Sequence, residues 1–89
     1  MNPHNKWDIY IDGASKGNPG ESGIGVIISK NGEVKKNISQ YIGITTNNVA
    51  EYMALIYGLQ EALIQNIRNI HINTDSELLY KQLTGDYKV

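Results

Sequence analysis

The chain contains no cysteine, no long apolar run and no block of like charge. The absence of cysteine excludes disulfide bonds, thiolate metal sites and cysteine nucleophiles. The longest apolar runs are far shorter than the ~20 residues that a membrane-spanning helix requires. Residues 1–6 lack the apolar stretch of a secretory signal, so we expect a cytoplasmic protein.

What remains is the composition of an ordinary globular domain, with 40% apolar and 19% charged residues. A length of 89 residues predicts one small domain, residues 1–89. The net charge of −1 provides too little positive charge to hold nucleic acid by bulk attraction alone. Two bound divalent cations would move the net charge from −1 to +3, and such cations could attract phosphate.

Three segments in the first half of the chain predict an antiparallel sheet. Residues 7–12 and 22–30 are rich in β-branched side chains and predict strands. The segment between them, residues 13–20, is dense in residues that tolerate special backbone angles and predicts a turn. The Asn-Gly pair at 31–32 is the strongest short hairpin signal and leads into a third strand at about residues 33–42.

A long helix is predicted next, capped by Asn47, Asn48 or Thr46 and extending to about Asn66. Apolar residues at three- and four-residue spacing predict the face that packs on the sheet. These residues are Val49, Met53, Ile56, Leu59, Leu63 and Ile67. Smaller or additional apolar residues broaden the stripe, namely Ala50, Ala54, Leu55 and Ala62. We therefore expect this helix to lie flat across the sheet.

The last segments predict a strand over residues 69–74 and a final helix from Ser76 to about Gly85. A strand that is reached by a helical crossover is expected to pair in parallel with the first strand. The predicted fold class is therefore α/β. A mixed sheet, made of a three-stranded antiparallel meander and one parallel strand, has helices packed on it.

Three carboxylates stand in apolar surroundings where a protein core is expected. Asp12 and Asp75 end the first and fourth strands, and Glu51 lies in the first turn of the long helix. Open α/β sheets bind ligands at the carboxyl ends of their strands, where these residues should meet. Since no Lys or Arg is placed in the same way, the three carboxylates predict a divalent-cation site.

Each of these residues also has a simpler interpretation when it is taken alone. A strand-terminal Asp commonly forms a turn or caps a helix. A Glu in the first helical turn commonly complements the helix dipole in solvent. His71, in the fourth strand, is interpreted as a packing residue of the sheet. The metal site is inferred from the three carboxylates together and from none of them singly.

Three motifs, in order, resemble those of type 1 ribonuclease H. Residues 9–20 read I-Y-I-D-G-A-S-K-G-N-P-G and are similar to the family's opening motif. Residues 46–51, T-N-N-V-A-E, and 73–76, N-T-D-S, are similar to its T-N-N-x-x-E and T-D-S motifs. The resemblance covers essentially the whole chain. It implies the N-terminal two-thirds of a ribonuclease H-like domain, with the C-terminal part missing.

The resemblance implies an endonuclease that hydrolyses the RNA strand of RNA–DNA hybrids with two Mg²⁺ or Mn²⁺ ions. Asp12 would bridge both ions, and Glu51 and Asp75 would complete the ligand shells. Six further residues would contact the hybrid, namely Gly13, Ser15, Asn18, Asn47, Asn48 and Glu77. The asparagines can also be turn formers and helix caps. The family often has Gln in place of Glu77, whose carboxylate would repel phosphate.

The family also uses a fourth acidic residue well downstream, after another strand and further helices. This sequence ends at Val89, and Asp86 comes too early to match, so we interpret it as a surface turn residue. Two other functions therefore stay open. One is an incomplete module that binds hybrid or metal but cuts poorly. The other is a part of a larger polymerase-like or transposase-like assembly.

The end of the sequence also predicts an exposed sheet edge. The fourth strand should lack a neighbouring fifth strand, which would leave Ile70 and Ile72 at an open edge. Open edges invite pairing with another chain. We therefore expect the 89-residue chain to associate as a homodimer.

Overall fold

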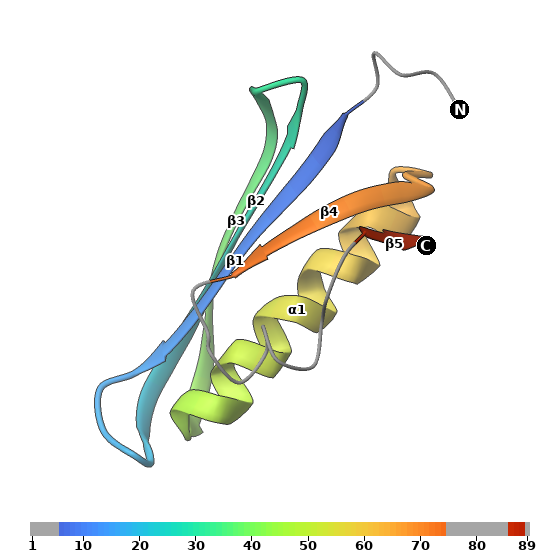
Figure 1. Ribbon diagram of the computed structural model, residues 1–89. Coiled ribbons are helices and arrows are strands. Elements are labelled where there is room, and N and C mark those ends of the chain that lie inside the picture. The colour runs from blue at the N-terminus through green and yellow to red at the C-terminus, as the bar shows by residue number, and fades with distance from the viewer. Residues whose placement is uncertain (1–5, 75–85, 89) are drawn as a thin grey trace.

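The computed structural model describes residues 6–74 and 86–88 (Figure 1). Its elements are β1 (Trp7–Ser15), β2 (Gly20–Lys30), β3 (Glu33–Thr45), α1 (Asn47–Ile64), β4 (Asn69–Thr74) and β5 (Asp86–Lys88). The helix predicted from Ser76 lies outside the described residues, as do Asp75 and Glu77. None of the described helices is long and apolar enough to cross a membrane.

The strands form one mixed sheet in the order β3-β2-β1-β4-β5. β1 pairs antiparallel with β2, and β2 pairs antiparallel with β3. β4 follows the helical crossover and pairs in parallel with β1, which confirms the predicted fold class. The predicted hairpin turn is also present: Asn31 and Gly32 have φ values of 52° and 83°. Positive φ at both positions is what this kind of tight hairpin requires.

The far edge of β4 is paired at residues 69–71, against our expectation of an open edge there. β5 runs antiparallel to β4, with Ile70 opposite Tyr87 and His71 opposite Asp86. Asp86 therefore lies in a strand, and its interpretation as a turn residue is wrong. The physical reason is that edge backbone groups need partners, and residues 86–88 of the same chain supply them. A homodimer stays a prediction. Residues 69–71 no longer support it, because their edge is already paired within the chain.

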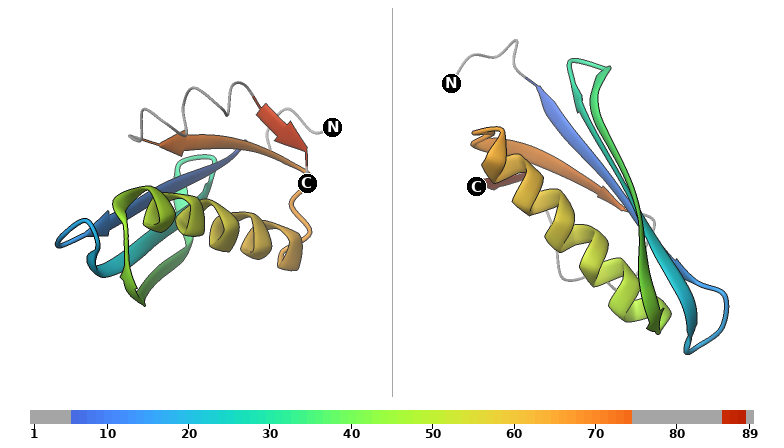
Figure 2. Two further views of the ribbon diagram at one scale, coloured as in Figure 1. Left: turned by 90° about the horizontal axis from the view of Figure 1, so that it is seen from below. Right: turned by 180° about the vertical axis from the view of Figure 1, so that it is seen from behind.

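The helix α1 lies across one face of the sheet, as expected (Figures 1 and 2). Thr46 is its N-cap, and the side-chain oxygen of Thr46 accepts a hydrogen bond of 3.3 Å from the Val49 N–H. This cap was one of the three predicted options. Because the helix begins at Asn47, Glu51 is its fifth residue and lies just beyond the first turn in which we expected it.

The face of α1 that packs on the sheet is built mostly from small residues. The buried helical residues are Ala50, Ala54, Leu55, Gly58 and Ala62. Val49, Ile56 and Leu63 of the predicted stripe are exposed by 43%, 51% and 59%, so their assignment to the packing face was wrong. A Cβ on Gly58 would lie 2.6 Å from Ile9 Cδ1. Small side chains therefore allow a close approach that the larger apolar set would prevent.

The two faces of the sheet have different surroundings. The face under α1 carries the core residues of the central strands, namely Ile9, Ile11, Ile24, Val26 and Ile28. Strand alternation directs Tyr10, Asp12 and Ile27 to the opposite side, which we call the open face. Tyr10 and Ile27 are 47% and 37% exposed there. None of the described helices covers the open face (Figure 2).

Candidate active site

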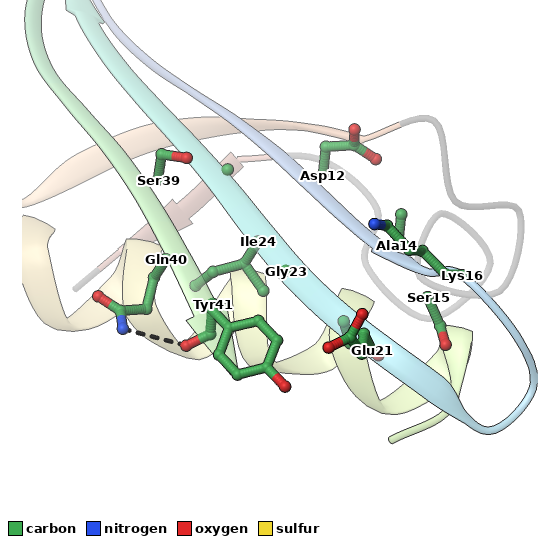
Figure 3. Close-up of a pocket in the computed structure, with 12 residues that line it drawn as sticks. Asp12, Ala14, Ser15, Lys16, Glu21, Gly23, Ile24, Ser39, Gln40 and Tyr41 are labelled. Carbon is green, nitrogen blue, oxygen red and sulfur yellow. Dashed lines mark hydrogen bonds between the residues drawn. The ribbon is translucent and has the colours of Figure 1, made fainter. Parts of the chain in front are cut away.

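Asp12 lies on the central strand of the sheet and is exposed. It is opposite Gly25 of β2, and the pairing of β1 with β4 is described as far as Ile11 and Thr74. Ile11 and Gly13 point inward, so strand alternation directs the Asp12 carboxylate to the open face (Figure 3). The expectation that Asp12 is buried in the core was therefore wrong. Asp75, which follows Thr74 in sequence, lies outside the described residues.

Glu51 is half-buried on α1, and its backbone lies next to the strand that carries Asp12. A Cβ on Gly13 would be 2.4 Å from the carbonyl carbon of Ala50 and 2.6 Å from the Glu51 nitrogen. The backbone of β1 thus contacts that of α1 at the residue after Asp12, which only glycine permits. The helix lies on the other face from the Asp12 carboxylate, so convergence of the carboxylates stays a prediction.

The described residues include two of the three carboxylates predicted to bind a divalent cation, namely Asp12 and Glu51. Within residues 6–74 and 86–88, no three His, Cys, Asp or Glu side chains are grouped closely enough to hold a metal ion. Asp12 and Glu51 are both carboxylates, which Mg²⁺ and Mn²⁺ prefer as ligands. Neither takes part in the ion pairs of the described chain, which join Lys35 to Glu33 and Lys36 to Glu61.

Hydrogen bonds fasten the loop between β1 and β2 to the start of α1. The Ser15 N–H donates to Asn47 Oδ1 at 2.8 Å, and the Asn47 N–H donates to Asn18 Oδ1 at 3.2 Å. The Ser15 hydroxyl lies within 3.0 Å of the Thr45 carbonyl oxygen. Three of the six residues predicted to contact a hybrid therefore hold one another. Asn48, another of the six, is exposed at the first turn of the helix.

Asn73 also belongs to this region, although it was not predicted as a site residue. It lies on β4 opposite Tyr10, and its side-chain nitrogen is 3.3 Å from Asp8 Oδ1 and 3.2 Å from the Ile9 carbonyl oxygen. These bonds connect β4 to β1 just before Asp12. The signal was present in the sequence, because Asn73 opens the N-T-D-S motif, but the motif was interpreted only through its Asp.

Asp12 borders two shallow hollows on the open face. One has a volume of about 630 Å³ and contains Lys16, Glu21 and Tyr41 (Figure 3). The other, of about 800 Å³, contains Tyr10 and faces β4. An exposed carboxylate between two hollows has room for both a cation and an extended ligand.

A comparison with protein families decides the family of the chain. The family model of RNase H matches residues 4–88. This chain belongs to the ribonuclease H family. The resemblance and the fold class expected from the sequence are both confirmed.

Curated relatives and solved structures of ribonuclease H agree with this assignment. The chain is 46% identical to Ribonuclease HI of Halobacterium salinarum, over 85% of this chain and 39% of that protein. It is 45% identical to Ribonuclease H of Wigglesworthia glossinidia brevipalpis, over 94% and 52%. The crystal structure of LC11-RNase H1 in complex with an RNA/DNA hybrid is similar with a TM-score of 0.81 at 43% identity, covering 86% of this chain and 59% of that one. The chain thus spans about half the length of these ribonucleases H.

Proposed function

We propose that this chain provides the catalytic carboxylates of an endonuclease that hydrolyses the RNA strand of RNA–DNA hybrids. The observation that carries the proposal is the position of Asp12 in a ribonuclease H fold. Its carboxylate is exposed, takes part in no ion pair of the described chain, and follows the β1 segment that pairs with β4. The similar crystal structure that contains an RNA/DNA hybrid supports this class of substrate.

Asp12, Glu51 and Asp75 are the proposed ligands of two Mg²⁺ or Mn²⁺ ions. Such a pair of ions, when bound, activates the attacking water and stabilises the leaving 3′-oxygen. Asp12 presents its oxygens on the accessible face of the sheet, so it can bind a cation without a change of the strand. Gly13 supports the site because its lack of a side chain lets the Glu51 segment of α1 lie against β1.

The proposed contacts to the hybrid are Ser15, Asn18, Asn47, Asn48 and Glu77. Gly13, the sixth residue proposed for hybrid binding, is buried against α1 and supports these contacts through the packing of β1 on the helix. Asn47 uses Oδ1 to accept from Ser15, and its side-chain NH₂ group is left to donate to a base edge or a 2′-hydroxyl. Such contacts in the shallow groove distinguish RNA from DNA. The network around Ser15 would hold these donors in place before the hybrid binds, which lowers the entropic cost of binding.

A cleavage assay with end-labelled substrates tests this proposal. We expect the chain to cut RNA in an RNA–DNA hybrid with Mg²⁺ or Mn²⁺ much more slowly than a complete ribonuclease H domain, to leave 5′-phosphate ends, and to spare single-stranded RNA and duplex RNA. A chelator should stop the reaction. Binding of hybrid without cleavage would favour the incomplete binding module instead. Equal cleavage of single-stranded RNA, or cleavage that survives the chelator, would contradict the proposal.

A further inference from the structure

Lys16 carries a positive charge near Asp12. It stands in the first of the three motifs, but no role has been proposed for it. It lies in the loop after β1 and lines the same hollow as Asp12. Figure 3 shows its side chain lying along the open face, past Ala14, with the ammonium group directed toward Asp12. Lys16 takes no part in the ion pairs of the described chain, and Lys30 is placed over the Trp7 ring instead. The Lys16 ammonium is therefore available to an anion.

The backbone beneath Lys16 is held on both sides. The Lys16 N–H donates to the Glu21 carbonyl oxygen at 2.8 Å, and the preceding Ser15 N–H donates to Asn47 Oδ1 at 2.8 Å. A Cβ on Gly20 would lie 2.4 Å from the Gly17 nitrogen, so the loop is closed tightly on itself. A charge on an anchored loop loses less conformational freedom when it binds a ligand.

The position of Lys16 determines which anion it can reach. Lys16 lies four positions after Asp12, and an extended backbone over this span separates the two Cα atoms by roughly 13 Å. The side chain shortens this distance by pointing back. An anion bound by the Lys16 ammonium therefore lies near a ligand bound at Asp12, but it occupies a separate position. Glu21 lines the same hollow, and its backbone is paired with that of Lys16, so its carboxylate disfavours an anion beside the Lys16 backbone and favours one on the Asp12 side. A polymer with regularly spaced phosphates fits this arrangement.

We propose that Lys16 is a positioning residue that binds a backbone phosphate of the hybrid adjacent to the phosphate cut at Asp12. This inference rests on the proposed function. A cation bound at Asp12 would neutralise the carboxylate that otherwise competes for the Lys16 ammonium. Lys16 then contributes to binding of any hybrid sequence, because phosphate contacts position a nucleic acid without reading its bases.

The test measures hybrid binding by fluorescence anisotropy at several salt concentrations, with Ca²⁺ in place of Mg²⁺ to prevent turnover. Lys16→Met should weaken binding several-fold at about 50 mM salt and reduce the slope of log K against log salt by about 1. Lys16→Arg should restore both quantities. Lys35→Met is the matched control, since it removes the same charge from the Glu33 pair at the opposite end of the sheet and should leave the slope unchanged.

The outcomes separate this inference from the proposed function. If the unmodified chain neither binds nor cuts hybrid, the proposed function is wrong and the inference falls with it. If the unmodified chain does both and Lys16→Met has an unchanged salt slope, only the inference is overturned. An unchanged salt slope together with tighter apparent Ca²⁺ binding in Lys16→Met would mean that Lys16 acts on the carboxylates, which also contradicts the inference. Matching circular dichroism spectra exclude a loss of folding as the cause.

Discussion

The two faces of the central strand β1 differ in how closely they are packed. On the face under α1, Ile9 is fully buried, and Gly13 leaves no room for even a methyl group beside Ala50. On the open face, Asp12 is exposed, and a Cβ on Gly25, its partner on β2, would meet nothing within 4 Å. The contrast separates two requirements. One face holds the fold together, whereas the other keeps charged groups accessible to a ligand.

The Asp12→Asn substitution tests whether the open face serves activity and not stability. We expect it to lower hybrid cleavage by at least about a thousandfold, or ~4 kcal/mol in the activation free energy. A neutral amide is a poorer ligand for Mg²⁺ than a carboxylate. Because the residue is exposed, the free energy of unfolding should change by less than about 0.5 kcal/mol. Single-turnover cleavage and urea unfolding measure the two quantities.

Asp8→Asn is the matched control, because Asp8 lies on the same strand and the same face four residues earlier. Its Oδ1 accepts from Asn73, and an Asn in its place still offers an oxygen acceptor. This variant removes the same charge and should keep most of the cleavage activity. A loss as large as that of Asp12→Asn would mean that general charge, and not ligation at Asp12, explains the effect.

A second comparison uses glycines on the two faces. Gly13→Ala places a methyl group 2.4 Å from the Ala50 backbone, so strand and helix must separate. We expect the free energy of unfolding to fall by about 3 kcal/mol. Gly25→Ala, on the neighbouring strand, has open space and should be neutral or stabilising by about 0.5 kcal/mol. Chemical denaturation measures the free energy of unfolding of both variants. Equal values would show that β1 and α1 can move apart at Gly13 without loss of stability.

The smallest expected effect concerns Asn47. Its Oδ1 accepts a hydrogen bond within the protein, and its side-chain NH₂ group is proposed to donate to the hybrid. Asn47→Ala removes the acceptor of the Ser15 N–H and should lower the free energy of unfolding by about 1 kcal/mol. Asn47→Asp keeps an acceptor and should unfold like the original chain. Both should bind hybrid more weakly. If Asn47→Asp binds as well as the original chain, the side-chain NH₂ group has no role in binding.

Much of the fold follows from local patterns in the sequence. The Asn-Gly turn at residues 31–32, the Thr46 cap among its three candidates, and the strand at residues 69–74 were all predictable. Each depends on residues close to one another in the chain. The face of α1 that packs was not predictable in the same way. Val49, Ile56 and Leu63 have the expected spacing, yet alanines and Gly58 occupy the interface.

The site divides in a similar manner. The motif around Asp12 identified the family from the sequence, and the family model confirms it. The outward direction of Asp12 follows from strand alternation, which buries Ile11 and turns the next residue to the other face. It was missed because the apolar neighbours indicated burial, and only the packing of α1 shows which face is covered. The bonds among Ser15, Asn18 and Asn47 were also missed. They join residues about thirty positions apart, and no local pattern reports such a contact.

The sequence by itself determined the kinds and order of elements from residue 7 to residue 74, because hydrophobic periodicity and turn residues act over a few positions. It also determined the family, through motifs read residue by residue. Only the tertiary structure decided that α1 approaches β1 at Gly13, that the face carrying Asp12 is the one α1 leaves open, and that residues 86–88 pair with residues 69–71 of β4. These features depend on how closely distant backbones can approach, and that distance is set by packing in three dimensions.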